Sequence, residues 1–227
     1  MKNGVLLTAT LLGSLLISAQ AVAGASANIG ATSNYIWRGL TQSQDRGAFS
    51  GGLDYEAENG LYVGTWASGL GGHGLGEEVD VYAGYAKELP NGFAYDVAAT
   101  TYQYPTATAG NAHFEEVSLK GSYGIAEAGV AYTVSSKDDT TAEFSKGDKY
   151  YHIGVNKELA NGFSVGGTVG KYDFDDAAGD DYTHTQIALT KSFKKAGDFV
   201  LAADKPSGRV GVTDTKVSLS WTKSFDF

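Results

Sequence analysis

The sequence predicts an all-β protein, a transmembrane antiparallel up-and-down β-barrel of about twelve strands. Three observations lead to this fold class. Polar and apolar residues alternate along the whole chain, as they do in strands with one apolar face. Short and long connections alternate between these runs, and aromatic residues of the apolar face gather near the ends of the runs, as in the two interfacial belts of a membrane barrel. A soluble β-sandwich would also alternate, but it would not sort aromatic residues by depth, so the barrel is favoured.

Residues 1–23 form a predicted signal peptide. The segment has a positive start, an apolar run and small residues at alternate positions, which are Lys2, Val5–Ser18, and Ala19, Ala21 and Ala23. The apolar run is too short to cross a bilayer as a helix, which needs about 20 residues. We therefore expect cleavage after Ala23, export to the outer membrane of a Gram-negative cell, and a single barrel domain over residues 24–227.

Composition excludes several classes of function. The chain of 227 residues has no cysteine, which excludes disulfides, thiolate metal sites and cysteine nucleophiles. The formal charge of −9 argues against nucleic acid as a partner, because nucleic acid requires a basic surface. The acidic stretch Asp173–Asp181 lacks the spacing of a calcium loop and is better explained as a solvated loop near lipopolysaccharide. We expect no metal and no cofactor.

The connections between runs are of two kinds. Some are tight and contain Asn59-Gly60, Asn91-Gly92 or Asn161-Gly162, since Asn-Gly supplies the positive φ angles of a short hairpin. The alternate connections are longer and polar, for example residues 136–147. Outer-membrane barrels have short periplasmic turns and long external loops. The sequence thus predicts periplasmic termini, a wall in contact with the lipid bilayer, and external loops in contact with lipopolysaccharide.

The end of the chain carries a predicted assembly signal. In the run Val217–Phe227, apolar residues occupy the odd positions except for Lys223. Trp221, Phe225 and the terminal Phe227 share one face, an arrangement that looks like the C-terminal signal of outer-membrane proteins. We expect the outer-membrane assembly machinery to recognise it.

The region Ser26–Gln44, followed by Gly52–Ser68, resembles the TorF family of exported proteobacterial porins. The mature chains of that family often open with the phrase ANxGxxSNYxWRGxxQ, which Ala27–Gln42 matches closely. The similarity covers the mature chain and is densest before Ser68. The resemblance implies an outer-membrane barrel with a channel role, and it supplies neither a substrate nor functional residues.

Alternation also predicts which side chains line the lumen. Tyr35 and Trp37 fall on the apolar face, as part of the outer aromatic belt. The predicted pore-lining residues are Arg38, Asp54, Glu56, Glu78, Asp80, Tyr82, Asp96, Tyr102, Glu116 and Lys120. Carboxylates dominate this set, and a ring of carboxylates favours cations. The inward tyrosines could form a stacking track for an aromatic, sugar or quaternary ammonium solute, or they could fill the barrel and close it. Arg38 is either a gating cation or, as we favour, half of a structural ion pair.

These observations predict a channel for passive diffusion of small cations or neutral solutes. The alternative is a closed structural or adhesion barrel that works through its external loops. A barrel enzyme is the third hypothesis, since four histidines are present: His73, His113, His152 and His184. None of them lies in a local nucleophile motif, so we do not expect catalysis.

Overall fold

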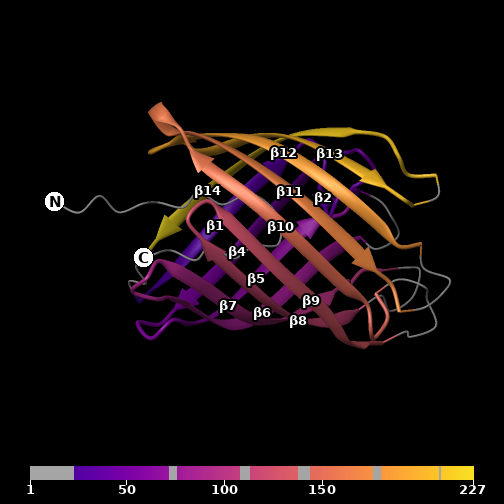
Figure 1. The fold of residues 1–227 in the computed structure, drawn as a ribbon, viewed down its shortest axis with the longest axis horizontal. Helices are drawn as coiled ribbons and strands as arrows, with labels where there is room; N and C mark the ends of the chain where they lie inside the picture. Colours follow the sequence, from indigo (N-terminus) through magenta and orange to yellow (C-terminus); the bar gives the residue numbers. More distant parts are fainter. Residues whose placement is uncertain (1–22, 72–75, 108–112, 138–143, 176–179, 210) are drawn as a thin grey trace.

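The computed structural model describes residues 23–71, 76–107, 113–137, 144–175, 180–209 and 211–227. In these residues, twelve strands form one closed antiparallel barrel in which neighbours in the sequence pair with each other and β1 closes against β14 (Figure 1). The predicted fold class is therefore confirmed. The predicted signal peptide lies almost entirely outside the described residues and stays a prediction.

The barrel strands are β1 (Gly24–Thr32), β4 (Ala48–Glu56), β5 (Leu61–Gly69), β6 (Glu77–Glu88), β7 (Phe93–Gln103), β8 (Phe114–Tyr123), β9 (Ala126–Ser136), β10 (Lys149–Glu158), β11 (Phe163–Asp173), β12 (Tyr182–Phe193), β13 (Gly197–Ser207) and β14 (Lys216–Asp226). Two further strands, β2 (Ile36–Trp37) and β3 (Leu40–Thr41), form a separate small sheet. A single 3₁₀ turn, Ala160–Gly162, is described between β10 and β11. Within the described residues, no helix is long and apolar enough to span a bilayer.

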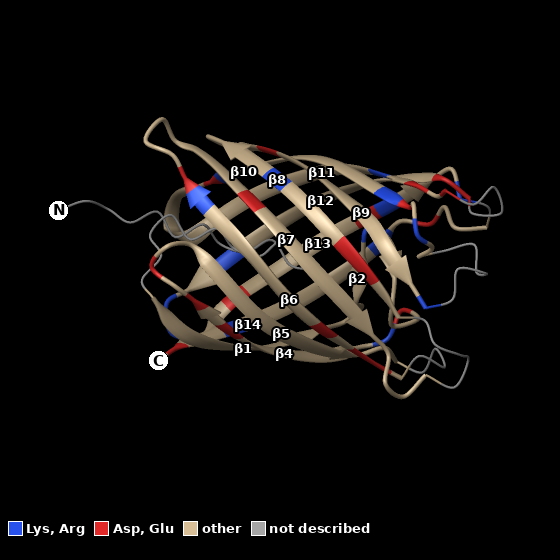
Figure 2. Ribbon diagram, turned by 90° about the horizontal axis from the view of Figure 1, so that it is seen from below, with Lys and Arg blue, Asp and Glu red and all other residues tan. Residues whose placement is uncertain are grey.

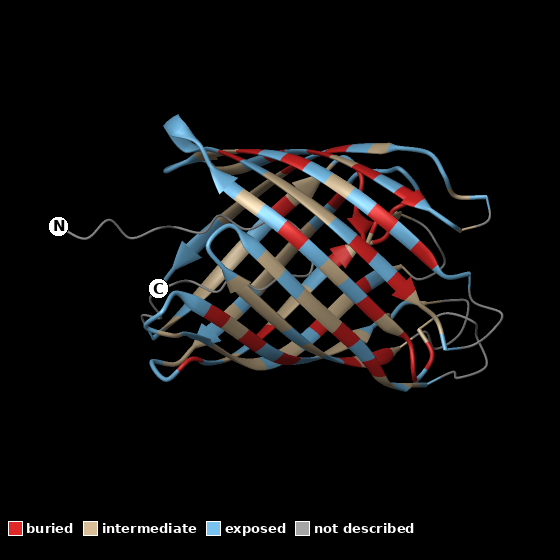
Figure 3. Cartoon of the chain, in the orientation of Figure 1, coloured by how far each residue is buried: buried red, intermediate tan, exposed pale blue. Residues whose placement is uncertain are grey.

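The two faces of the wall differ as the alternation predicts. Aliphatic side chains such as Leu53, Ile153 and Leu219 are more than half exposed on the outside, which in a membrane is the lipid side. Along most of the wall strands, exposed positions alternate with buried or half-buried ones (Figure 3). Lys, Arg, Asp and Glu occur at both ends of the barrel, and acidic and basic segments also lie along the strands between the ends (Figure 2). Strand carboxylates such as Asp80, Asp96 and Glu116 are buried, so they face away from the lipid side. A wall of this kind suits a hydrocarbon layer, because charge facing mid-bilayer lipid costs about 2–4 kcal/mol for Lys or Arg.

The Asn-Gly pairs lie at short connections, as predicted. Gly60 and Gly92 have φ of 90° and 83°, and Asn161 and Gly162 have φ of 60° and 72°. Such positive φ values are what a tight hairpin requires. The start of β1 and the C-terminal end of β14 lie side by side at the end of the barrel where these short connections are found (Figure 1).

Residues 33–47 correct one sequence-based prediction. Tyr35 and Trp37 were expected on the outer face of the wall, but β1 ends at Thr32 and the chain then turns into the barrel. Arg38 (φ 48°) and Gly39 (φ 85°) form the tip of the small β2–β3 hairpin. We call residues 33–47 the inward segment; both residues of β2 are buried, and the strand lies within the outline of the barrel in Figure 1.

The inward position changes the role of the aromatic residues. Tyr35 and Trp37 are only 3% and 9% exposed, so their assignment to the outer belt was wrong. Together with Phe114, Tyr172 and other rings they form an aromatic cluster inside the long-loop end of the barrel. Periodicity alone could not reveal this, because an aromatic belt and an aromatic plug show the same spacing. What separates them is the backbone reversal at Arg38 and Gly39.

Candidate functional site

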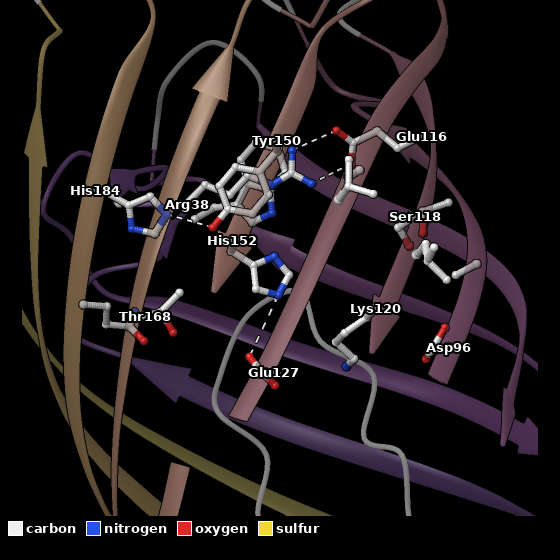
Figure 4. Close-up of a pocket in the computed structure, with 18 of the residues that line it drawn as sticks. Arg38, Asp96, Glu116, Ser118, Lys120, Glu127, Tyr150, His152, Thr168 and His184 are labelled. Atoms are coloured by element: carbon white, nitrogen blue, oxygen red, sulfur yellow. Dashed lines mark hydrogen bonds and ion pairs between the residues drawn. The ribbon is translucent and has the colours of Figure 1, made fainter. Parts of the chain in front are cut away.

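Arg38 lies within the lumen and contacts side chains of the barrel wall. Its Nη1 and Nη2 donate to Oε1 and Oε2 of Glu116 on β8, at 2.8 and 2.7 Å. The guanidinium carbon stands 4.1 Å from the ring centroid of Trp37 and 4.3 Å from that of Tyr150 on β10 (Figure 4). A planar guanidinium suits this environment, because it binds a carboxylate with two parallel bonds while stacking on aromatic faces. The inward segment is thus fixed to two strands of the wall.

Further contacts hold the rest of the inward segment. The Tyr182 hydroxyl donates to the backbone carbonyl of Arg38 at 3.1 Å. Asp45 binds Lys216 of β14, with Nζ 2.6 Å from Oδ2, and this hydrogen bond lowers the pKa of the Asp45 carboxyl. The Tyr35 hydroxyl donates to Glu78 at 2.8 Å. Burial, with the charge of Glu78 added, raises the pKa of Tyr35, so the phenol keeps its proton.

Position 39, at the tip of the hairpin, has no room for a side chain. A Cβ built on Gly39 would collide with the side chain of His184, and its φ of +85° disfavours any L-residue with a side chain. The imidazole of His184 is in turn fixed by Tyr150, whose hydroxyl lies 2.8 Å from Nε2. The tip therefore rests directly on the barrel wall.

The aromatic cluster occupies the long-loop end of the lumen around Arg38. Tyr102 stacks on Phe114 at a centroid distance of 4.5 Å, and Phe114 stacks on Phe144 at 4.8 Å. On the other side Tyr172 stacks on Phe174 at 4.4 Å. Each such pair contributes about 0.5–1.5 kcal/mol beyond the area it buries. The cluster and the inward segment together narrow the barrel from one end.

All of the predicted pore-lining residues lie on the inward side of the wall or, for Arg38, within the lumen. Glu78, Asp80, Asp96 and Glu116 are buried. The others, Asp54, Glu56, Tyr82, Tyr102 and Lys120, are half-buried and lie at inward positions of the wall. Whether they line a path for solutes stays a prediction.

Tyrosine hydroxyls cap several of the inward carboxylates. Tyr82 donates to Asp54 at 2.5 Å, and Tyr62 donates to Asp96 at 2.8 Å. Tyr102 adds a contact of 3.2 Å to Glu116. A carboxylate that accepts such bonds is held against the wall and has part of its charge satisfied there. Asp80 differs, because its buried Oδ1 has no hydrogen-bond partner among the described residues.

A cavity of about 160 Å³ lies beneath the tip of the inward segment. Trp37 and Arg38 border it on one side, and inward side chains of β7 to β12 complete it. Its polar groups include Asp96, Lys120, Glu127, His152, Thr168 and Gln186. Figure 4 shows Lys120 between Glu127 and Asp96, with His152 facing Glu127. The cavity can therefore offer both hydrogen-bond donors and acceptors to a small polar solute.

Glycines on the inward face make room for the cavity side chains. A Cβ on Gly129 would meet the ring of His152, and one on Gly170 would meet His184 and the Tyr150 hydroxyl. Both rings consequently lie flat against bare backbone of the neighbouring strand. His152 and His184 both line the cavity, and periodicity in the sequence could not show that glycines accommodate them.

The sequence reasoning missed two inward carboxylates of the wall. Glu127 comes directly after the tight turn at Gly124 and was left unassigned, although its alternation with Ala126 and Ala128 marks it as inward. Asp204 is 1% exposed and accepts a hydrogen bond of 2.9 Å from the Gln186 amide. It lies inside β13, where its neighbours Ala203 and Lys205 are half-buried and exposed.

The remaining predicted residues lie on the surface. Phe225 and Phe227 are 43% and 83% exposed on the outer face, and the Trp221 indole donates to the Ala196 carbonyl at 2.6 Å. Their recognition by assembly machinery stays a prediction. Of the other histidines, His113 is half-exposed beside Glu115, and His73 lies outside the described residues.

The described part of the acidic stretch 173–181 is tied into ion pairs at the rim. Lys171 Nζ lies 3.0 Å from Asp173 and 3.5 Å from Asp181, and Lys149 Nζ lies 3.7 Å from Asp175. Among the residues that the structure describes, no group of three or more His, Asp or Glu is arranged to hold a metal ion.

Solved structures with the same architecture are outer-membrane barrels. The KdgM porin matches with a TM-score of 0.56 and 7% identity, over 89% of this chain and 99% of that one. KdgM in complex with disordered oligogalacturonate matches with 0.56 and 6%, over 89% and 99%. The COG4313 outer membrane channel from Pseudomonas putida F1 matches with 0.56 and 13%, over 95% and 100%. Identity this low shows a shared fold, a membrane-type β-barrel.

Residues 18–208 match the model of a family described as bacterial proteins of unknown function (Gcw_chp). The chain belongs to this family, since the match covers most of its length. The TorF resemblance of Ala27–Gln42 stays a prediction. No curated protein matches the chain in sequence.

Proposed function

We propose that this chain is an outer-membrane channel through which small cations and neutral solutes diffuse passively. The observation that carries the proposal is the polar cavity beneath the inward segment, within a closed barrel whose inward face is rich in carboxylates. The inward segment narrows the lumen, and the cavity lies next to this narrow zone. A path shaped in this way restricts passage by size as well as by charge.

The balance of charge supports the preference for cations. Acidic residues at inward positions include Asp54, Glu56, Glu78, Asp80, Asp96, Glu116, Glu127 and Asp204. The cations described near the cavity are Arg38 and Lys120, and Arg38 is bound to Glu116. A low-dielectric wall focuses the field of such charges on the path of an ion. KdgM was solved with oligogalacturonate, a polyanion, and the same cargo would be repelled by the carboxylates of this lumen.

A second candidate is a closed barrel that acts through its external loops. The specific observation in its favour is the aromatic cluster, which fills the long-loop end of the lumen and encloses the buried ion pair of Arg38 and Glu116. If the inward segment stays docked at all times, a solute has to pass around the aromatic cluster. A cluster that leaves no gap for a solute would make the barrel closed. Tyrosines that fill the lumen would then have a structural role alone.

Conductance in a planar lipid bilayer separates these candidates. The purified, folded protein is inserted and a KCl gradient is applied. The channel proposal expects discrete steps of current and a reversal potential of cation-selective sign. Added salt should weaken the preference as the Debye length falls to about 3 Å at 1 M. An anion-selective sign contradicts the preference, and an absence of current from folded protein favours the closed barrel.

Fractionation of the bacterial envelope tests the location. We expect the mature chain, beginning near Gly24, in the outer-membrane fraction and with a folded form that migrates differently before and after heating. Recovery from the periplasmic fraction without detergent would contradict a membrane location.

A further inference from the structure

Most inward charges near the cavity lie beside an opposite charge or a hydrogen-bond donor. Glu116 binds Arg38. Asp96 accepts from Tyr62 and lies directly opposite Lys120 in the β7–β8 register. Asp204 is buried against Gln186. These pairings leave Glu127 as the carboxylate most open to a solute in the cavity.

Glu127 lies at the edge of the cavity with its side chain 37% exposed. Its neighbour is the imidazole of His152, whose Nε2 is 3.9 Å from Oε1 of Glu127, a separation longer than a hydrogen bond (Figure 4). At that distance the two side chains are not locked together. The carboxylate can therefore accept hydrogen bonds from a visiting donor.

Gly154 opens a niche beside this carboxylate. On β10 it lies between Glu127 of β9 and Thr168 of β11, directly opposite both in the register. A Cβ on Gly154 would be 3.0 Å from the Glu127 Oε1 and 3.3 Å from the Thr168 Oγ1. The carboxylate and the hydroxyl thus converge over bare backbone, where no side chain of β10 intervenes.

The acceptors in this niche suit an ammonium group better than a metal ion. Hard cations such as Ca²⁺ require six to eight oxygen ligands, and the described residues hold no metal-binding group of three or more acidic or histidine side chains. A primary ammonium has N–H donors that a carboxylate and a hydroxyl accept directly. The stacked rings of Tyr150 and His152, 5.7 Å apart, supply a surface for its carbon stem. A water-sized site takes up about 10–15 Å³ of such volume. The cavity of about 160 Å³ therefore has room for a solute of roughly ten non-hydrogen atoms.

We infer that the niche at Gly154 is a binding subsite for small primary ammonium solutes, with Glu127 as the residue that recognises the ammonium group and Thr168 as its second acceptor. This inference rests on the proposed channel function and names the solute class that the channel prefers. The Glu127 carboxylate attracts the solute into the narrow zone, and release is possible because only two acceptors hold it.

The test compares methylammonium with potassium in the bilayer experiment. With KCl on one side and methylammonium chloride on the other, the reversal potential gives the permeability ratio of the two cations. We expect Glu127→Gln, which keeps the shape and removes the charge, to lower the methylammonium/potassium ratio by roughly three- to tenfold, as loss of a charge contact in a site of effective dielectric near 20 allows. Glu127→Asp keeps the charge and should retain most of the ratio.

A matched control and a second variant complete the design. Glu88→Gln removes the same charge at the exposed end of β6 and should leave the ratio unchanged. Gly154→Ala places a methyl group between Glu127 and Thr168 without altering any charge, and it should lower the ratio in the same direction as Glu127→Gln. Heat-modifiable migration of each variant verifies folding. If Glu127→Gln does not fold, the permeability ratio of Gly154→Ala tests the subsite.

The outcomes separate this inference from the channel proposal. Cation-selective current with an unchanged ratio in folded Glu127→Gln or in folded Gly154→Ala overturns the subsite and leaves the channel standing. An equal fall in Glu88→Gln would show a general effect of charge and also overturns the subsite. An absence of current from the folded wild-type protein overturns both.

Discussion

Arg38 and Glu116 are 78 positions apart in the sequence and meet inside the barrel through two hydrogen bonds of 2.8 and 2.7 Å. Their side chains are 10% and 4% exposed. Removing one partner of a buried pair leaves the other charge uncompensated, at a cost of about 3–5 kcal/mol. The pair therefore helps to keep the inward segment docked against the wall.

Arg38→Met should loosen the inward segment and raise single-channel conductance or open-state noise. Methionine keeps much of the apolar contact with Trp37 and Tyr150 but leaves Glu116 without its cation. Arg46→Met is the matched control, since Arg46 belongs to the same segment and its guanidinium donates a hydrogen bond of 3.1 Å to the backbone carbonyl of Gly71 at an exposed position. Conductance traces that are identical for Arg38→Met and wild type would show that the segment is held by other contacts.

Gly39→Ala should displace the hairpin tip from the wall. The new Cβ would meet the His184 side chain, in addition to the strain of φ +85°, which costs of the order of 1 kcal/mol. Gly124→Ala has a comparable φ of +61° but no neighbour within 4 Å, so it carries the strain without the collision. We expect the midpoint temperature of thermal unfolding to fall in both variants. Channel conductance should change only in Gly39→Ala. Equal behaviour of the two variants would contradict a tight contact at the tip.

The ion pair of Asp45 and Lys216 should give the inward segment a weak sensitivity to acid. The pKa of Asp45 is lowered in the folded protein, so its contribution to docking is present above the ordinary carboxyl range and is lost as the pH falls through the lowered pKa. Both side chains are partly exposed, and such a pair contributes at most about 1 kcal/mol. Current noise measured from pH 6 down to pH 3 should rise at the acidic end in wild type, and Asp45→Asn should show the raised noise at every pH. Equal current noise in wild type and Asp45→Asn at every pH would contradict this role.

Protease added to intact cells should cut the long connection between β9 and β10 and spare the Asn91-Gly92 turn. The physical reason is that long loops of outer-membrane barrels face outside, whereas short turns face the periplasm. Mass spectrometry of the fragments identifies the sites. Cleavage at Asn91-Gly92 in intact cells would invert the proposed orientation.

Deletion of Phe227 should reduce the yield of folded protein in the outer membrane without changing the finished barrel. Phe227 is 83% exposed, and its backbone N–H donates to the Ala25 carbonyl at 3.0 Å, a single contact at the end of the β1–β14 seam. Asp226→Asn is the control, because it alters the adjacent residue and keeps the terminal ring. A normal yield after deletion would show that the terminal aromatic residue has no part in assembly.

The fold could be predicted from the sequence because the alternation within each strand indicates that strand independently of the others. The alternation of Leu53, Asp54, Tyr55 and Glu56 assigns both faces of β4 without knowledge of any neighbour, and a register slip of one residue would turn every charge toward lipid. Asn-Gly pairs give the positions of the short turns for an equally local reason, their tolerance of positive φ. The strands, the side of the wall that each residue faces and the short turns could therefore be predicted in advance.

The path through the barrel was decided by tertiary structure. The residues after Thr32 have the alternation of a strand, and only contacts with residues far along the chain, namely Glu116, Tyr150 and Tyr182, bring Trp37 and Arg38 into the lumen. The niche at Gly154 likewise exists because β9, β10 and β11 are in a register that sets Glu127 and Thr168 on either side of a glycine. Alternation determines which side of a wall a residue faces, whereas the partner it meets across the lumen depends on strand register and barrel closure, which no local pattern encodes.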